Sequence, residues 1–241
     1  MLPSFETAQK IFAEFEINLT ETEYAAFLTY AEFMVEYNKK VNLTAITEPH
    51  DILVKHFLDS VIPLTYIEFE PGFTLLDIGT GAGFPGVPMA IMHPELSLTL
   101  MDANGKKITF LTELCEKLRD TIPLNVKIVK GRAEDCARGE LRAAFDIVTA
   151  RAVAPLSQLA EYAMPYAKIG GTFLALKGAS ESYEQGAAMV EELGGDLADF
   201  VEYNLSGGDL RRLFIIEKID ITPKKYPRSN AQITARKAPR R

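Results

Sequence analysis

A glycine-rich stretch in the first half of the chain constrains the fold more than any other feature. Residues 75–86 read Leu-Leu-Asp-Ile-Gly-Thr-Gly-Ala-Gly-Phe-Pro-Gly. The apolar run 74–78 before the glycines has the length and composition of a buried parallel strand. Helix-like residues 86–92 follow the glycines. A strand, a glycine turn and a helix together let the backbone approach a ligand closely and direct a helix N-terminus towards it.

The spacing of the glycines indicates which kind of ligand fits the turn. Counted from Gly79, the dinucleotide fingerprint G-x-G-x-x-G places Phe84 where a glycine is required. Counted from Gly81 the fingerprint fits formally, but it encloses Pro85. The pattern G-x-G-x-G, with Asp77 two residues before it, suits a cofactor that has no pyrophosphate, such as S-adenosylmethionine. The alternative is a tight turn without a ligand, but alternating glycines weaken a fold unless a bound group must come close.

The alternation of strand-like and helix-like segments after residue 73 predicts the architecture. Strands are expected at 74–78, 97–102, 125–130, 145–150 and 171–176. Helices are expected at 86–92, 105–119, 155–164 and 181–193. Two further strands, 199–205 and 211–219, flank the hairpin signal Ser206-Gly207-Gly208-Asp209. The pattern predicts an α/β fold with a mostly parallel seven-stranded sheet and a C-terminal antiparallel hairpin, the Rossmann-like shape of class I methyltransferases.

Residues 1–65 are expected to form a helical extension before the sheet. Thr20-x-x-Glu23 has the form of a capping box that opens the second of three helices. The third helix is expected from about residue 49 to residue 61. We therefore predict a helical extension over 1–65, an S-adenosylmethionine-dependent methyltransferase domain over 66–221 and a basic tail over 222–241.

Charge is distributed unevenly along the 241 residues. The net charge is −7, yet the tail contains seven cations and no acid, so removing this +7 leaves −14 on the rest of the chain. The cations are Lys224, Lys225, Arg228, Arg236, Lys237, Arg240 and Arg241. Such an asymmetry indicates either a nucleic-acid-binding arm or a solvated tail.

The composition disfavours several classes of protein. The first fifteen residues contain Glu6 and Glu14 and no long apolar core, so they do not resemble a signal peptide. No apolar run approaches the roughly 20 residues that a membrane span needs. Cys115 and Cys136 form no C-x-x-C pattern, and no histidine has a partner at zinc spacing. We expect a cytoplasmic protein without membrane association and without a metal site.

Acidic residues follow the second and third expected strands. Asp102 lies 23 residues after Gly79, close to where an acid binds ribose hydroxyls in this fold, and the alternative role is to cap the helix that follows. The loop after the third strand lies beside adenine in this fold. There the backbone N–H of Ala133 and the carboxylate of Glu134 would read the adenine edge. The alternative is that Glu134 and Asp135 only favour the start of a short helix.

Cations follow the fourth and fifth expected strands. Arg151 and Lys177 are placed to contact substrate, a cofactor carboxylate or RNA phosphate, and a surface salt bridge is the alternative. We assign no general base or nucleophile, and for Arg151 we expect at most a role in positioning the substrate. The chain lacks the Asn- or Asp-Pro-Pro-aromatic loop of amine methylation, a cysteine after the fourth strand and a His–Asp dyad. Guanine N7 needs none of these, because it is an unprotonated acceptor and positioning with electrostatics suffices.

The sequence resembles the RsmG family of 16S rRNA guanine-N7 methyltransferases, also called glucose-inhibited division protein B, over roughly residues 20–230. The matching stretches are 37–38, 42–46, 56–60, 77–86, 131–134, 150–154 and 176–178. The resemblance implies S-adenosylmethionine binding at Gly79, Phe84, Ala133, Glu134 and Arg151, to which the residue pattern adds Gly81 and Asp102. It also implies that the product is 7-methylguanosine at position 527 of 16S rRNA, in the decoding-region loop.

The resemblance leaves several functional alternatives to be weighed. We expect a monomer that meets 16S rRNA within a 30S particle or an assembly intermediate. The other possibilities are a methyltransferase for a small molecule or another RNA, a nicotinamide-dependent oxidoreductase and an RNA-binding protein without catalysis. The misfit of Phe84 and Pro85 to the dinucleotide fingerprint argues against the oxidoreductase.

Overall fold

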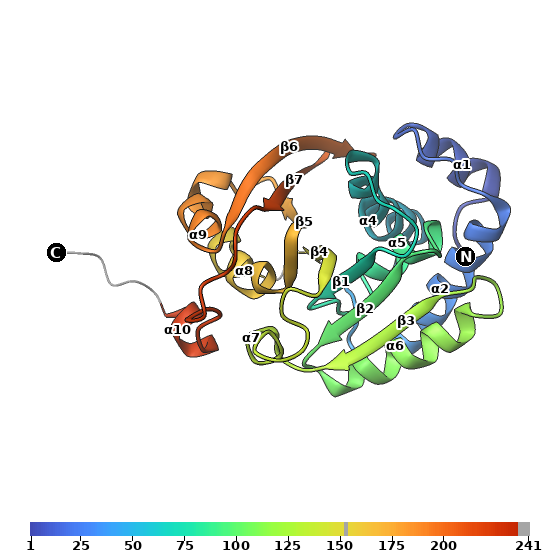
Figure 1. The fold of residues 1–241 in the computed structure, drawn as a ribbon. Helices are drawn as coiled ribbons and strands as arrows, with labels where there is room; N and C mark the ends of the chain where they lie inside the picture. The colour runs from blue at the N-terminus through green and yellow to red at the C-terminus, as the bar shows by residue number, and fades with distance from the viewer. Residues whose placement is uncertain (152–153, 236–241) are drawn as a thin grey trace.

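The computed structural model describes residues 1–151 and 154–235, and within them a seven-stranded sheet has helices on both faces (Figure 1). The strand order is β3-β2-β1-β4-β5-β7-β6, in which β1 to β5 pair in parallel and β7 pairs antiparallel with β5 and β6. The strands are β1 Thr74–Ile78, β2 Ser97–Asp102, β3 Asn125–Lys130, β4 Phe145–Arg151, β5 Ala167–Gly178, β6 Gly195–Leu205 and β7 Asp209–Lys218. The predicted fold class is confirmed.

The helical segments follow the predicted order, with two differences. They are α1 Phe5–Ala13, α2 Glu21–Asn38, α3 Pro49–Asp51, η1 Ile52–Leu58, α4 Asp59–Val61, η2 Ile62–Tyr66, α5 Gly86–Met92, α6 Gly105–Leu118, α7 Ala133–Cys136, α8 Leu156–Ala163, η3 Met164–Tyr166, η4 Tyr183–Gln185, α9 Ala187–Glu192 and α10 Asn230–Thr234. The helix expected over 49–61 has π-helical geometry in its centre, η1. The helix expected over 181–193 is wrong as a single element. It is divided at Gly186, where a Cβ would come within 2.6 Å of Leu156.

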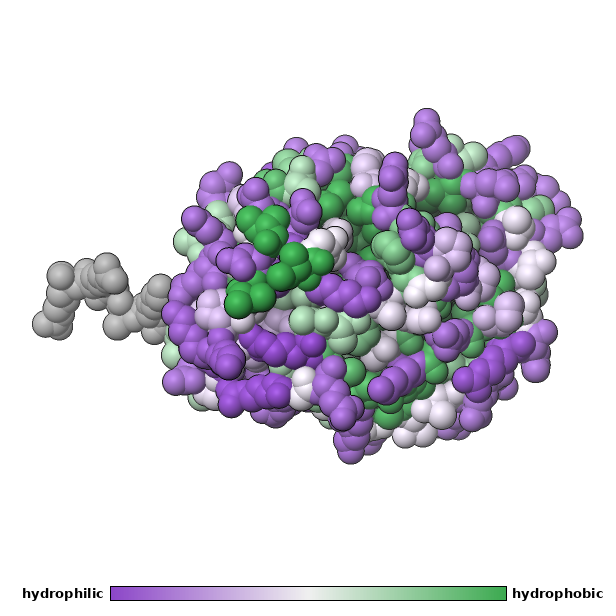
Figure 2. All heavy atoms as spheres, in the orientation of Figure 1, coloured by the Kyte–Doolittle hydropathy of each residue, from purple (hydrophilic) through white to green (hydrophobic). Residues whose placement is uncertain are grey.

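Two hydrophobic clusters fill the space between the sheet and its helices. Because successive side chains of a strand point to opposite faces, Leu75 belongs to one cluster and Leu76 to the other. The first cluster includes α5, α6 and the N-terminal helices, and the second includes α8 and α9. Residues 1–65 therefore share the core of the sheet domain instead of enclosing a core of their own. Hydrophilic side chains cover most of the face in Figure 2, with small hydrophobic patches between them.

The helix α2 connects the N-terminal extension to the glycine turn. The predicted capping box at its start is confirmed, since Thr20 N–H donates to Glu23 Oε2 at 2.7 Å and Glu23 N–H donates to Thr20 Oγ1 at 3.3 Å. Further along α2, the buried hydroxyl of Tyr30 donates to the carbonyl of Ala82 inside the turn. The N-terminal extension thus stabilises the glycine turn through this hydrogen bond.

The first part of the predicted tail packs on the sheet domain. Residues 222–235 run back along the molecule to α10, which lies against α8 (Figure 1). Tyr226 and Ile233 are buried there, so the alternative of a solvated tail does not hold for this part. The four cations Arg236, Lys237, Arg240 and Arg241 lie outside the described residues. None of the described helices is both long enough and apolar enough to cross a membrane.

Candidate functional site

The glycine turn joins β1 to α5 and has a backbone that only glycine adopts readily. Gly79, Gly81 and Gly83 have φ values of +65°, +61° and +100°. The N–H groups of Gly79 and Thr80 donate to the carbonyl of Met101 at 2.9 and 3.1 Å, so the turn is fastened to the end of β2. This geometry brings backbone to the carboxyl edge of the sheet, where ligands bind in open α/β folds.

Asp77 holds the turn together from the interior. Its side chain is completely buried, and Oδ2 accepts hydrogen bonds from Thr80 Oγ1 at 2.6 Å and from Gly86 N–H at 2.9 Å. Within the part of the chain that the structure describes, Oδ1 has no hydrogen-bond partner. Burial therefore raises the pKa of the Asp77 carboxyl from its ordinary 3.8 to about 7.

We expect Asp77 to make the protein less stable as pH rises towards neutrality. A raised pKa means that the folded state holds this proton more tightly than the unfolded state, so the contribution is complete below pH 3.8 and is lost as pH rises through about 7. Between about pH 6 and pH 7.5 the loss should be about 1 kcal/mol. Urea unfolding of wild type and Asp77→Asn across this range checks the prediction. Parallel pH profiles of the two proteins would contradict it.

A cavity of about 330 Å³ opens beside the turn, at the carboxyl ends of β1, β2 and β3. Its walls come from segments far apart in the sequence. They are Ile78, Gly79, Met101, Asp102, Ala103, Gly131, Arg132, Ala133, Glu134, Ala154, Gln158, Tyr162, Asn230 and Thr234. Of the seven predicted cofactor residues, Gly79, Asp102, Ala133 and Glu134 line this cavity.

Asp102 lies at the rim of the turn with its carboxylate only partly used. Oδ2 accepts from Gly81 N–H at 3.0 Å and Oδ1 accepts from Asn104 N–H at 2.8 Å. A carboxylate has about four acceptor positions, so each oxygen can still accept a hydroxyl. The N-cap of α6 is Asn104, whose side chain accepts from Lys106 N–H, so the capping alternative for Asp102 is not what the structure shows. Gly81 thus contributes by orienting Asp102.

Glu134 brings a second carboxylate to the cavity. It lies in the first turn of α7, as its helix-start alternative predicted, yet only 6% of it is exposed. Arg132 Nη1 lies 3.9 Å from Glu134 Oε1, which is too far for a hydrogen bond. The Glu134 oxygens are not among the fully buried atoms that lack a partner in the described residues, so they are reached from the cavity and can accept hydrogen bonds from a bound group.

The residues of this cavity fit an adenosine-containing cofactor. Ile78, Met101 and Tyr162 provide the apolar surface that a purine ring needs. The free acceptor positions of Asp102 suit a ribose diol, and Glu134 suits an amino group. Within residues 1–151 and 154–235, no group of three His, Cys, Asp or Glu side chains is arranged to hold a metal ion.

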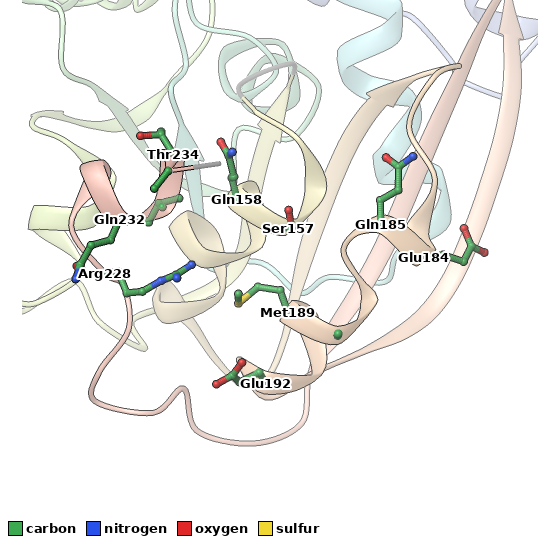
Figure 3. Close-up of a pocket in the computed structure, with 12 residues that line it drawn as sticks. Ser157, Gln158, Glu184, Gln185, Met189, Glu192, Arg228, Gln232 and Thr234 are labelled. Atoms are coloured by element: carbon green, nitrogen blue, oxygen red, sulfur yellow. The ribbon is translucent and has the colours of Figure 1, made fainter. Parts of the chain in front are cut away.

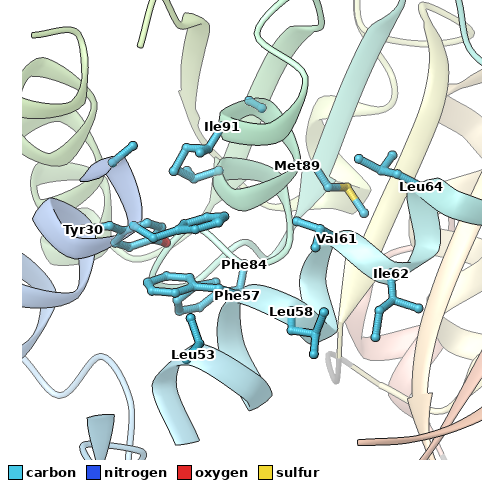
Figure 4. Close-up of a cluster of buried hydrophobic side chains, with 14 of the residues drawn as sticks. Tyr30, Leu53, Phe57, Leu58, Val61, Ile62, Leu64, Phe84, Met89 and Ile91 are labelled. Atoms are coloured by element: carbon cyan, nitrogen blue, oxygen red, sulfur yellow. The ribbon is translucent and has the colours of Figure 1, made fainter. Parts of the chain in front are cut away.

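Phe84 does not line the cavity. It lies in a buried cluster with the aromatic rings of Tyr30 and Phe57 (Figure 4). Its ring stacks on Tyr30, with centroids 5.3 Å apart, and on His56, with centroids 4.3 Å apart. The guanidinium of Arg151 lies 5.0 Å from the ring centroid on the same cluster. Burial and the nearby Arg151 lower the pKa of His56 to about 3, so the imidazole is neutral. The cofactor contact of Phe84 stays a prediction.

Arg151 and Lys177 line a second hollow, of about 260 Å³, beyond the ends of β4 and β5. Arg151 Nη1 donates to Asp59 Oδ2 at 3.3 Å and to Ser60 Oγ at 3.2 Å, so Arg151 forms a salt bridge, but with a buried aspartate and not at the surface as the alternative supposed. Lys177 donates to the carbonyl of Ala154 and lies 3.8 Å from Glu181. The two residues after Arg151 are outside the described part, and its cofactor contact also stays a prediction.

The hollow in Figure 3 is larger, at about 610 Å³, but it lies between α8, α9 and α10. No strand end lines it, and none of the predicted cofactor residues does. The cavity beside the glycine turn is therefore the one that the predicted cofactor residues line. That cavity also has walls that sequence reasoning missed, namely Gln158, Tyr162, Asn230 and Thr234.

Comparison with known sequences agrees with this geometry. A family model described as GidB, rRNA small subunit methyltransferase G, matches residues 23–193. Ribosomal RNA small subunit methyltransferase G of Clostridium tetani (strain Massachusetts / E88) is 43% identical over 222 residues, which cover 90% of this chain and 92% of that protein. The protein of the same name from Staphylococcus aureus (strain Newman) is 42% identical over 219 residues, 89% of this chain and 90% of that one.

Comparison with solved structures shows the same fold at low identity. A SAM-dependent methyltransferase from Aquifex aeolicus superposes with a TM-score of 0.53 at 16% identity. The superposition covers 76% of this chain and 98% of that structure.

Proposed function

Because the chain belongs to the GidB family, rRNA small subunit methyltransferase G, we propose that it methylates guanine N7, at position 527, in 16S rRNA. It is an S-adenosylmethionine-dependent rRNA methyltransferase. The observation that supports the assignment of the cofactor site is the cavity beside the glycine turn. There a partly free carboxylate, Asp102, and a largely buried carboxylate, Glu134, line the same cavity as the apolar side chains of Ile78 and Met101.

The proposed reaction depends on the positioning of guanine N7 against the methyl group and needs no general base. When bound, S-adenosylmethionine supplies an electrophilic methyl group on a sulfonium. The methyl–sulfur bond breaks as the bond to guanine N7 forms, and the N7 lone pair needs no base. Asp102 would hold the ribose, Ala133 and Glu134 the adenine, and the turn the methionine end. Phe84 and Arg151 would contact the cofactor from the aromatic cluster that they form with Tyr30 and His56.

We infer that the second hollow receives the RNA. It lies at the same edge of the sheet and contains Lys55, Arg151, Lys177 and Arg211, beside the buried Asp59. Lys55 and Arg211 are the more exposed of these cations and can attract phosphate. An acidic body makes additional recognition of RNA shape or of ribosomal protein necessary. We propose that the substrate is a 30S particle or an assembly intermediate, met by a monomer in the cytoplasm.

Mapping of 7-methylguanosine in 16S rRNA tests the function directly. Cells with the gene should carry one 7-methylguanosine at the decoding-region loop, and cells without it should lack that modification. Purified protein with radiolabelled S-adenosylmethionine should label 30S particles more than naked 16S rRNA. Unchanged 7-methylguanosine in the deletion strain, or labelling of a metabolite alone, would contradict the proposal.

A further inference from the structure

We propose that the C-terminal segment 222–235 is part of the cofactor site, and that Asn230 is a specificity-determining residue that contacts the adenosine portion of S-adenosylmethionine. The inference rests on the proposed function, because it assumes that the cavity beside the glycine turn holds this cofactor. The segment comes after the last strand, so its return to the first strands is a property of the folded chain and not of any local motif.

Three arginines fasten the segment to the sheet domain. Arg142 donates to the carbonyls of Thr222 at 2.8 Å and Tyr226 at 2.9 Å, and Arg138 donates to the carbonyl of Pro227 at 3.0 Å. Arg228, which belongs to the segment itself, forms a salt bridge with Glu161 of α8. These contacts engage four residues of the segment, Thr222, Tyr226, Pro227 and Arg228, which is more than a solvated tail requires.

The pair of Arg228 and Glu161 is the strongest of these contacts. The Glu161 side chain is completely buried. Its Oε1 accepts from Arg228 N–H at 2.7 Å and from Nε at 2.9 Å, and Oε2 accepts from Nη2 at 2.5 Å. Such a forked, charge-assisted contact fixes direction as well as distance. It fixes the chain two residues before Asn230.

The helix α10 that follows separates two hollows. Asn230 lines the cofactor cavity, Thr234 lines both hollows, and Gln232 lines only the larger one (Figure 3). Asn230 lines the cofactor cavity together with Gln158 and Tyr162 of α8 and Glu134 of α7. An asparagine amide offers both a donor and an acceptor, the combination that matches the amino group and ring nitrogen of adenine.

Calorimetric binding of S-adenosylhomocysteine and of 5′-methylthioadenosine tests the contact without requiring turnover. Asn230→Ala should weaken both ligands by the same factor, about 10-fold, because they share the adenosine. Gln232→Glu is the matched control, since it keeps the capping oxygen that accepts from Ser229 N–H and faces the other hollow, and it should change neither dissociation constant more than about twofold. Unchanged binding by Asn230→Ala would overturn the inference, as would a loss confined to S-adenosylhomocysteine.

Arg228 is a positioning residue in this scheme and needs a separate readout. Arg228→Met should raise the KM for S-adenosylmethionine about 10-fold with little change in kcat at saturation, and Arg228→Lys should fall between it and wild type. Lys225 lies in the same segment and forms an exposed ion pair with Glu192 of α9. Lys225→Met breaks this pair and should leave the KM for S-adenosylmethionine unchanged. Equal effects of the Arg228 and Lys225 variants on KM would overturn this role. If wild type binds S-adenosylhomocysteine but does not methylate guanine N7, the proposed function fails while the binding test of Asn230 stands.

Discussion

Replacing Gly83 by alanine is expected to lower the free energy of unfolding by about 3 kcal/mol or more and to abolish measurable cofactor binding. Gly83 has φ +100°, a conformation that alanine rarely adopts. The added Cβ would lie 2.6 Å from the hydroxyl of Tyr30 and 2.9 Å from Val87 Cγ2. Because that hydroxyl donates to the carbonyl of Ala82, the clash would displace both the turn and the helix that supports it.

A substitution at a second glycine distinguishes the effect of steric crowding at Gly83 from the effect of its positive φ. Gly207 in the β6–β7 turn has φ +108°, but a Cβ there would have no heavy atom within 4 Å. Gly207→Ala should therefore cost only about 1 kcal/mol, and it should leave S-adenosylhomocysteine binding intact. Urea unfolding and calorimetry on both variants give the comparison. If the two substitutions destabilised the protein equally, close packing of the turn against Tyr30 would not be the cause of the larger effect expected for Gly83→Ala.

The glycine turn was predictable from the sequence because its requirements are local. Positive φ values at alternate positions leave glycine as the natural residue, and an apolar run before it is the ordinary signature of a buried strand. The order of strands and helices followed from similar local patterns. The same reasoning predicted where Asp102 and Glu134 would lie, since parallel strands end at one edge of the sheet.

Contacts across long sequence separations were not predictable in this way. Glu161 and Arg228 are 67 residues apart, and each by itself has the character of an ordinary surface charge. The helix α10 has only five residues, too few for a hydrophobic period, so no pattern placed Asn230 in the cofactor cavity. The nearest signal was the excess of cations in the tail, and it indicated either a nucleic-acid-binding arm or a solvated tail, not a contact with the sheet domain.

The roles of Phe84 and Arg151 show a different limit. The resemblance implied cofactor contacts for both, but a resemblance assigns residues without their surroundings. The structure places both side chains in the aromatic cluster with Tyr30 and His56, where they join the N-terminal extension to the turn. Buried ionic contacts such as that of Arg151 with Asp59 depend on three-dimensional neighbours that no spacing rule supplies.

Asp102→Asn is expected to weaken S-adenosylmethionine binding by about 100-fold, which corresponds to about 2.7 kcal/mol. Hydrogen bonds to a charged acceptor contribute about 1.5–3 kcal/mol each, and a ribose diol donates two. Asparagine has one acceptor oxygen where aspartate has two, and the amide N–H groups would face a hydroxyl or a backbone donor. Each carboxylate oxygen also accepts one backbone hydrogen bond, from Gly81 N–H or from Asn104 N–H, so the substitution also loosens the turn.

A nearby carboxylate shows whether this loss is specific. Asp135 is exposed, follows Glu134 in α7 and does not line the cofactor cavity, so Asp135→Asn should change binding by less than about twofold. Both variants remove one negative charge near the same cavity, and therefore a general electrostatic attraction for the sulfonium would weaken in both. A 100-fold loss in Asp102→Asn alone assigns the effect to hydrogen bonds at the end of β2. Similar losses in the two variants would instead assign it to net charge and would remove the ribose role from Asp102.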